Sequence, residues 1–148
     1  MTQRLKLALV AVVAAATLGA AVYFRAGVAP LPPVFSEHLS LGEAERLSAA
    51  NGKPVLVLGS ADWCAPCQVF KRTALIDPGV EAYIRAHFVP VYLNVDEHQD
   101  EAGVLAITSL PASIVMKNGK RLAKLEGVVR ADELLAWLRS TAEGEHGR

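Results

Sequence analysis

The sequence has few of the side chains that a metal centre needs. Its 148 residues include only two cysteines, Cys64 and Cys67, and four histidines. A zinc site needs about four ligands, usually with a second Cys or His pair at short spacing. The histidines are instead scattered singly, at His38, His87, His98 and His146. We therefore expect no metal site and no cofactor, and we expect His87, on the apolar face of its helix, to be at least half-buried.

The chain also lacks net charge, with 15 basic and 15 acidic side chains. Without a basic excess there is no global field to attract nucleic acid, so we expect no nucleic-acid partner. The acidic run DEHQDEAG lacks the alternating pattern of a calcium loop, and acids at a helix start are its ordinary explanation. The balance hides an asymmetry, because residues 1–30 contain three basic and no acidic side chains.

Charge is missing altogether from residues 7–24, LALVAVVAAATLGAAVYF. As a helix this stretch would span about 27 Å, close to the thickness of a bilayer core. It predicts an uncleaved membrane anchor, with a cleaved signal peptide as the alternative. Arg4 and Lys6 favour a cytoplasmic location for the N-terminal end. We therefore expect the remainder to be periplasmic or otherwise extracytoplasmic, anchored in the inner membrane.

Composition divides the chain into four parts. Prolines 30, 32 and 33 indicate an extended, semi-rigid spacer between membrane and domain. The segment after them has the length and periodicity of one domain with a hydrophobic core. The predicted parts are a signal anchor or signal peptide (1–25), a Pro-rich linker (26–35), a globular domain (36–140) and a polar tail (141–148).

Local patterns in the globular part alternate between helix and strand. SLGE at residues 40–43 fits a capping box, and PVLVLG at residues 54–59 reads as a strand buried on both faces. A second strand is predicted at residues 89–95, and Asn118-Gly119 marks a hairpin between two further strands. Helices are predicted from about residue 64, from residue 78, after the acidic run and through residue 107, and over residues 131–138. This order indicates a single α/β domain with a mixed sheet covered on both faces.

The two cysteines follow the first predicted strand, in the stretch DWCAPC. A purely structural disulfide would close a very short loop and constrain the unfolded chain little. A thiolate at a helix start is stabilised by unpaired N–H groups, and spacing of three residues brings Cys64 and Cys67 within bridging reach. Pro66 is tolerated in a first helical turn and stiffens it. Trp63 either shields the pair or offers a contact surface, with ordinary packing as the alternative. We favour a redox-active pair.

ADWCAPC after KPVLVLGS resembles the active-site stretch of the thioredoxin superfamily. The motifs LNVD, SLPASIVMKNGK and LEGV follow in the order that this superfamily shows, so the resemblance covers about residues 35–140. The DPGV helix after DWC, behind an exported N-terminus, is most similar to periplasmic thiol–disulfide interchange proteins. The C-terminal domain of DsbD-type reductases is the nearest comparison.

The resemblance implies a thioredoxin-like mixed sheet flanked by helices, and it implies roles for individual residues. Cys64 would be the attacking nucleophile and Cys67 the resolving thiol. Pro111 would follow a cis peptide bond beside the disulfide, with Leu110 offering backbone to a substrate strand. Gly127 matches the family's glycine near the substrate groove.

Two positions depart from the family pattern. Thioredoxins have a buried acid six residues before the nucleophile, and that position is Leu58 here. The lysine that partners this acid is replaced by Tyr92. Losing both together avoids an orphaned buried charge, but it leaves open what accepts the proton of Cys67. Asp62, which we expect to point to solvent, and water are the candidates.

The sequence thus predicts an extracytoplasmic thiol–disulfide oxidoreductase that acts on protein thiols and disulfides. Pro66 is the second of the two residues between the cysteines, and a proline there resembles the reducing thioredoxins. We therefore expect a reductant. An upstream membrane electron donor would then restore the dithiol. The alternative is a thioredoxin-like binding module, or a cytochrome c maturation component, in which the thiols play a secondary role.

Overall fold

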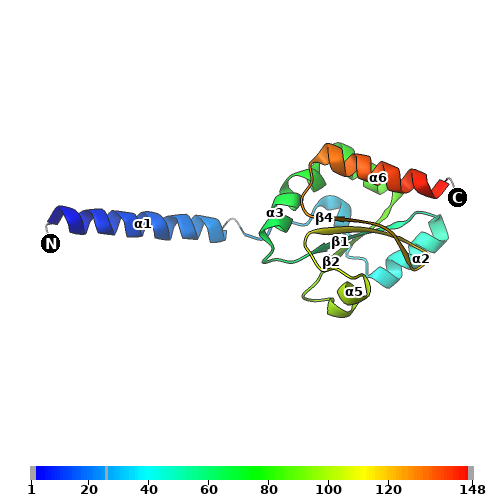
Figure 1. The fold of residues 1–148 in the computed structure, drawn as a ribbon, viewed down its shortest axis with the longest axis horizontal. Helices are drawn as coiled ribbons and strands as arrows, with labels where there is room; N and C mark the ends of the chain where they lie inside the picture. Colours follow the sequence, from blue (N-terminus) through cyan, green and yellow to red (C-terminus); the bar gives the residue numbers. More distant parts are fainter. Residues whose placement is uncertain (1–2, 26, 147–148) are drawn as a thin grey trace.

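The chain folds around one mixed, four-stranded sheet (Figure 1). The computed structural model describes residues 3–25 and 27–146. β1 runs parallel to β2 and antiparallel to β3, and β3 and β4 form the predicted hairpin. The strands lie in the order β2-β1-β3-β4, with bounds β1 (Val55–Ser60), β2 (Val89–Asn94), β3 (Ala112–Lys117) and β4 (Lys120–Glu126).

Helices cover both faces of the sheet, as predicted. One face carries α2 (Leu41–Asn51) and α5 (Gln99–Val104); the other carries α3 (Ala65–Arg72), α4 (Pro78–His87) and α6 (Ala131–His146). Alternate residues of β1 supply the two cores, because successive side chains of a strand point to opposite faces. Val57 packs on the α2 and α5 side, and Leu58 packs on the side of α3, α4 and α6. All of β1 is buried, which explains its continuous apolar sequence.

The element ends follow from specific capping residues. Ser40 and Glu43 form the predicted capping box at the start of α2, and Gly52 ends that helix with a φ of 76°. Asp77 accepts backbone hydrogen bonds at the start of α4. The hairpin turn places Asn118 and Gly119 at φ values of 52° and 70°, which Asn and Gly tolerate better than other residues.

α1 (Gln3–Arg25) extends away from the sheet as one long helix (Figure 1). Within the part of the chain that the structure describes, no helix combines the length and the apolar character needed to cross a bilayer. α1 ends two residues before Gly27, so the chain reaches the globular part almost directly.

Residues 27–35, here called the entry segment, differ from the extended spacer that the prolines suggested. Pro33–Phe35 form a short 3-10 helix, η1, and the side chains of Val34 and Phe35 are only 1% and 2% exposed. Both join the core between the sheet and the α3, α4 and α6 layer. Proline fixes the backbone but does not prevent apolar neighbours from packing, and burial of these two side chains draws the segment into the domain.

α6 continues through residues 141–146, into the segment that composition assigned to a polar tail. Leu134, Leu138 and Ala142 are buried along one side of this helix. Residues four positions apart share a helix face, so Ala142 extends the apolar stripe by one turn.

Candidate active site

The two cysteines lie at the start of α3, where β1 gives way to the helix. Cys64 is the N-cap residue, and its Sγ accepts a hydrogen bond of 3.2 Å from the backbone N–H of Cys67. The sulfurs form a disulfide between Cα atoms 5.2 Å apart. Cys64 is 4% exposed and Cys67 1%, and Pro66 lies in the first turn as predicted. An N–H group that already points at Cys64 Sγ is suited to stabilise negative charge on that sulfur.

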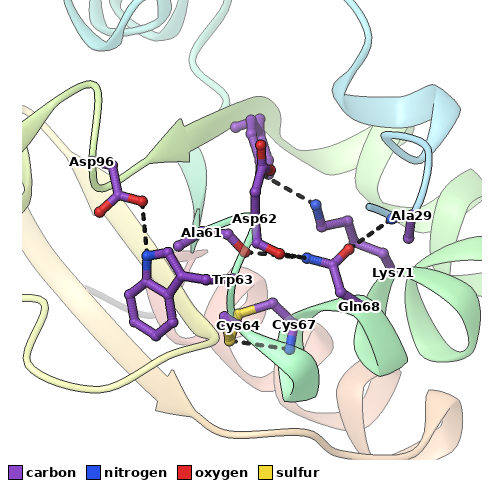
Figure 2. The surroundings of a disulfide bond; sticks show 10 residues. Ala29, Ala61, Asp62, Trp63, Cys64, Cys67, Gln68, Lys71 and Asp96 are labelled. Atoms are coloured by element: carbon purple, nitrogen blue, oxygen red, sulfur yellow. Dashed lines mark hydrogen bonds between the residues drawn. A yellow bond between two sulfur atoms is a disulfide. The ribbon is translucent and has the colours of Figure 1, made fainter. Parts of the chain in front are cut away.

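Gln68 fixes the loop that leads to Cys64 (Figure 2). Its Nε2 donates to the carbonyl oxygens of Ala61 and Asp62, each at 3.1 Å. Its Oε1 accepts from the backbone N–H of Ala29 in the entry segment, at 2.7 Å. One buried amide therefore joins α3, the loop before Cys64 and the entry segment.

Trp63 lies on the surface rather than in a packed core. It is 71% exposed, and its Nε1 donates a 2.8 Å hydrogen bond to Asp96, just after β2 (Figure 2). Asp62 is exposed, as expected, and only its carbonyl takes part in the loop contacts. The tryptophan is thus held in one orientation beside the disulfide with its ring available for contact.

A groove of about 520 Å³ opens beside the cysteines. Trp63, Cys64 and Pro66 form one wall, and residues 107–110 form the other. Leu110 contacts the small core cluster around the two cysteines, and the Leu110-Pro111 peptide bond is cis, which confirms that implication of the resemblance.

Gly127 and Glu126 hold the Pro111 side of the groove. The backbone N–H of Gly127 donates to the carbonyl of Pro111 at 2.8 Å, and Gly127 has a φ of 86°, which favours glycine. The pKa of Glu126 lies below its ordinary value of 4.5, because Lys124 and then Ser109 hydrogen-bond to its carboxylate. Ser109 belongs to the groove wall, so this carboxylate ties β4 to the site.

Beneath α3, the two departures from the family pattern lie side by side. Leu58 is 2% exposed and pairs in register with Tyr92 on the neighbouring strand. The Tyr92 hydroxyl accepts a 3.2 Å hydrogen bond from Nζ of Lys71. Lys71 is itself only 3% exposed, although it is a lysine on the helix that carries the cysteines.

Sequence reasoning did not identify Gln68 or Lys71, although both lie on the buried face of α3. Val69 is 51% exposed, and the helix ends at Arg72, before the 3-10 helix η2 (Ala74–Ile76). The buried face consists instead of Cys67, Gln68, Phe70 and Lys71. The available signal was the spacing from Cys67 to Lys71, since residues four apart share one helix face.

Among the described residues, no histidine lines the groove or packs against the two cysteines. His87 is exposed and stacks on Tyr83 with ring centroids 4.2 Å apart, so the expectation of a half-buried histidine was wrong. Its position at the last residue of α4 explains the difference, because the end of a helix faces solvent more readily than its middle. Among the described residues, no three His, Cys, Asp or Glu side chains converge to hold a metal ion.

Comparison with known proteins identifies the family. The sequence profile of the thioredoxin-like domain matches residues 41–142. The chain belongs to this thioredoxin-like family. A thioredoxin from Alicyclobacillus acidocaldarius is 34% identical over 104 residues, which cover 68% of this chain and 93% of that thioredoxin.

Two solved structures share the thioredoxin-like fold. DsbH oxidoreductase matches with a TM-score of 0.63 and 18% identity, over 78% of this chain and 88% of that one. The oxidised DsbD C-terminal domain of Neisseria meningitidis matches with a TM-score of 0.57 and 24% identity, over 68% of this chain and 90% of that one. At these identities the likeness shows the fold alone. The fold and the Cys64–Cys67 pair are those of a thioredoxin-like thiol–disulfide oxidoreductase.

Proposed function

We propose that this thioredoxin-like protein reduces disulfides of partner proteins outside the cytoplasm, in the manner of DsbD-type interchange domains. The observation that carries the proposal is the Cys64–Cys67 disulfide at the start of α3, opening into the groove beside Leu110. A buried structural disulfide would not need an adjoining groove, a groove wall that ends at the cis Leu110-Pro111 bond, and an exposed tryptophan.

We infer different roles for the two sulfurs, and their places at the groove support this. Cys64 lines the groove, whereas Cys67 lies behind it and is less exposed. In the reduced protein, the Cys64 thiolate attacks a partner disulfide, forms a mixed disulfide and releases one partner thiolate. Cys67 then loses its proton and attacks Cys64, which forms the Cys64–Cys67 bond and releases the second partner thiolate. Two electrons pass to the partner, and the released thiolates take protons from solvent.

Continued turnover needs a donor that returns two electrons to the pair. We infer a membrane dithiol protein as this donor, and a tether formed by residues 7–24. The support for the tether is the uncharged sequence of this stretch and the basic residues Arg4 and Lys6 before it. Carbonate extraction of membranes from cells that make the full chain tests the tether. Recovery of the chain in the soluble fraction would contradict the tether but would not contradict the proposed disulfide exchange.

The exchange mechanism is tested by trapping. A Cys67→Ser variant cannot resolve mixed disulfides, so it should accumulate partners attached through Cys64 on non-reducing gels. A Cys64→Ser variant is the matched control and should trap none. Equal partner profiles for the two variants and the wild type would favour a binding module in which the thiols are secondary.

The direction of electron flow is tested by the reduction potential of the Cys64–Cys67 couple. We expect a value near or below about −250 mV, as in reducing thioredoxins. A value near −120 mV, about that of the strong oxidant DsbA, would reverse the proposed direction.

A further inference from the structure

Lys71 is the only charged side chain that is buried among those the structure describes. Its Nζ donates to the Tyr92 hydroxyl and lies 5.1 Å from the centroid of the tyrosine ring. The ion pairs among the described residues do not include it. A buried ammonium group without a carboxylate lowers stability relative to a packed apolar side chain. Stability alone therefore does not explain a lysine at this position.

The position of Lys71 relative to Cys67 suggests what it does. Both residues are buried on α3, four positions apart, so their Cβ atoms lie about 5–6 Å from each other. The side chain of Lys71 extends from this face of α3 to the Tyr92 hydroxyl on β2, within the same buried layer as Cys67 (Figure 2). Tyr92 holds the ammonium group in the interior beneath α3, where charges interact more strongly than in water, so it can act on the Cys67 sulfur through space.

Few other ionisable groups surround this pair. β1 and η2 contribute none, and β2 contributes only Tyr92. Asp62 and Asp96 are exposed at the mouth of the site. Ser60 lies on the α3 side of β1, and its buried hydroxyl has no hydrogen-bond partner among the described residues. The interior behind the cysteines thus offers one positive charge and one unused hydroxyl, but no buried acid.

We propose that Lys71, held by Tyr92, supplies the positive charge that promotes deprotonation of Cys67 when it resolves the mixed disulfide. The inference rests on the proposed exchange function. In this step the S–H bond of Cys67 breaks and its proton goes to solvent. The Cys64–Cys67 bond forms, and the electron pair of the broken mixed disulfide leaves with the partner sulfur. Lys71 does not bond to either sulfur; it is a positioning residue that acts through its charge.

A two-phase assay separates attack from resolution. One equivalent of 5,5′-dithiobis(2-nitrobenzoate) is mixed with the reduced full-length protein, and thionitrobenzoate release is followed by stopped flow. The first release reports attack by Cys64, and the second reports resolution by Cys67. The second rate is measured as a function of pH for the wild type and for Lys71→Met, Lys71→Arg and Lys120→Met.

If the positive charge of Lys71 promotes deprotonation of Cys67, the variants should differ from one another. Lys71→Met should raise the pH midpoint of the second-phase rate by about one unit. Below the midpoint, resolution should then be about tenfold slower than in the wild type. Its melting temperature should stay equal or rise, because an apolar side chain replaces a buried charge. Lys71→Arg should keep the midpoint of the wild type. Lys120→Met, the same change at the exposed hairpin, should alter neither.

Two outcomes would overturn the inference. One is an unchanged pH midpoint of the second phase in Lys71→Met. Should the methionine variant fail to fold, Lys71→Gln takes its place, and an unchanged midpoint there would have the same meaning. The other is an equal rise in the Met and Arg variants, which would mean that shape matters rather than charge. Absence of both release phases in the wild type would instead reject the exchange function itself, so the two failures are distinguishable.

Discussion

The backbone N–H of Ala29 donates to the side chain of Gln68, which connects the entry segment to the helix of the active site. The same amide holds the carbonyl groups of Ala61 and Asp62, just before Cys64. Residues far apart in sequence thus share one buried side chain. The catalytic loop is supported by a part of the chain that precedes the residues matched by the family profile.

The entry segment should therefore contribute strongly to stability. Phe35→Ala removes a side chain that is 2% exposed, and we expect it to lower the free energy of unfolding by about 3–5 kcal/mol. Urea unfolding followed by circular dichroism measures this change. Val28→Ala, in the same segment but 53% exposed, should change stability by no more than about 0.5 kcal/mol. Similar values for both variants would mean that the segment is not part of the core.

Gln68→Glu tests the bridge with little change in shape. The carboxylate still accepts from Ala29, but it cannot donate to the two carbonyl oxygens of the loop. We expect a loss of at least about 2 kcal/mol, because a buried charge would replace two hydrogen bonds. Gln99→Glu makes the same change on the exposed face of α5 and is the control. A small effect at both positions would show that the loop keeps its shape without Gln68.

Trp63 should matter for partner binding and little for stability. Because its ring is 71% exposed, Trp63→Ala should leave the melting temperature nearly unchanged. We expect KM for a protein disulfide substrate to rise about tenfold, which corresponds to about 1.4 kcal/mol of lost contact. Val104→Ala, at a residue 83% exposed on α5, provides the comparison. An unchanged KM would remove Trp63 from the contact surface.

Glu126 should make the groove wall sensitive to acid. Hydrogen bonds from Lys124 and Ser109 lower the pKa of this carboxyl in the folded state. Its contribution to stability is therefore present above the unfolded pKa and is lost as pH falls through the folded pKa. Melting temperature measured between pH 2 and pH 6 should decline less steeply toward acid in Glu126→Gln than in the wild type. Parallel profiles would show that the carboxylate contributes nothing measurable at this exposed position.

The sequence was informative wherever a local rule decides the structure. Ser40 and Gly52 bound a helix through capping chemistry, and Asn118-Gly119 sets the hairpin turn. Cys64 and Cys67 were recognisable because strand, turn and helix start follow one another within a few residues. The cis bond before Pro111 came from family resemblance, since composition and spacing carry no information on peptide isomers.

Residues whose partners lie far away in the sequence could not be found in this way. Nothing near Gln68 in the sequence indicates that its partner Ala29 lies 39 residues before it. Nothing near Lys71 indicates that Tyr92 reaches it from another element. Prolines in the entry segment suggested an open chain, but Val34 and Phe35 pack into a core formed mostly by later residues.

The chain passes from the end of α1 to a contact with α3 over very few residues. Gly27, whose carbonyl accepts a hydrogen bond from Arg72, follows the end of α1 by two residues, which span at most about 7 Å. Should residues 7–24 form the proposed tether, the short path from α1 to the entry segment means that a reaction partner would meet Cys64 close to that tether.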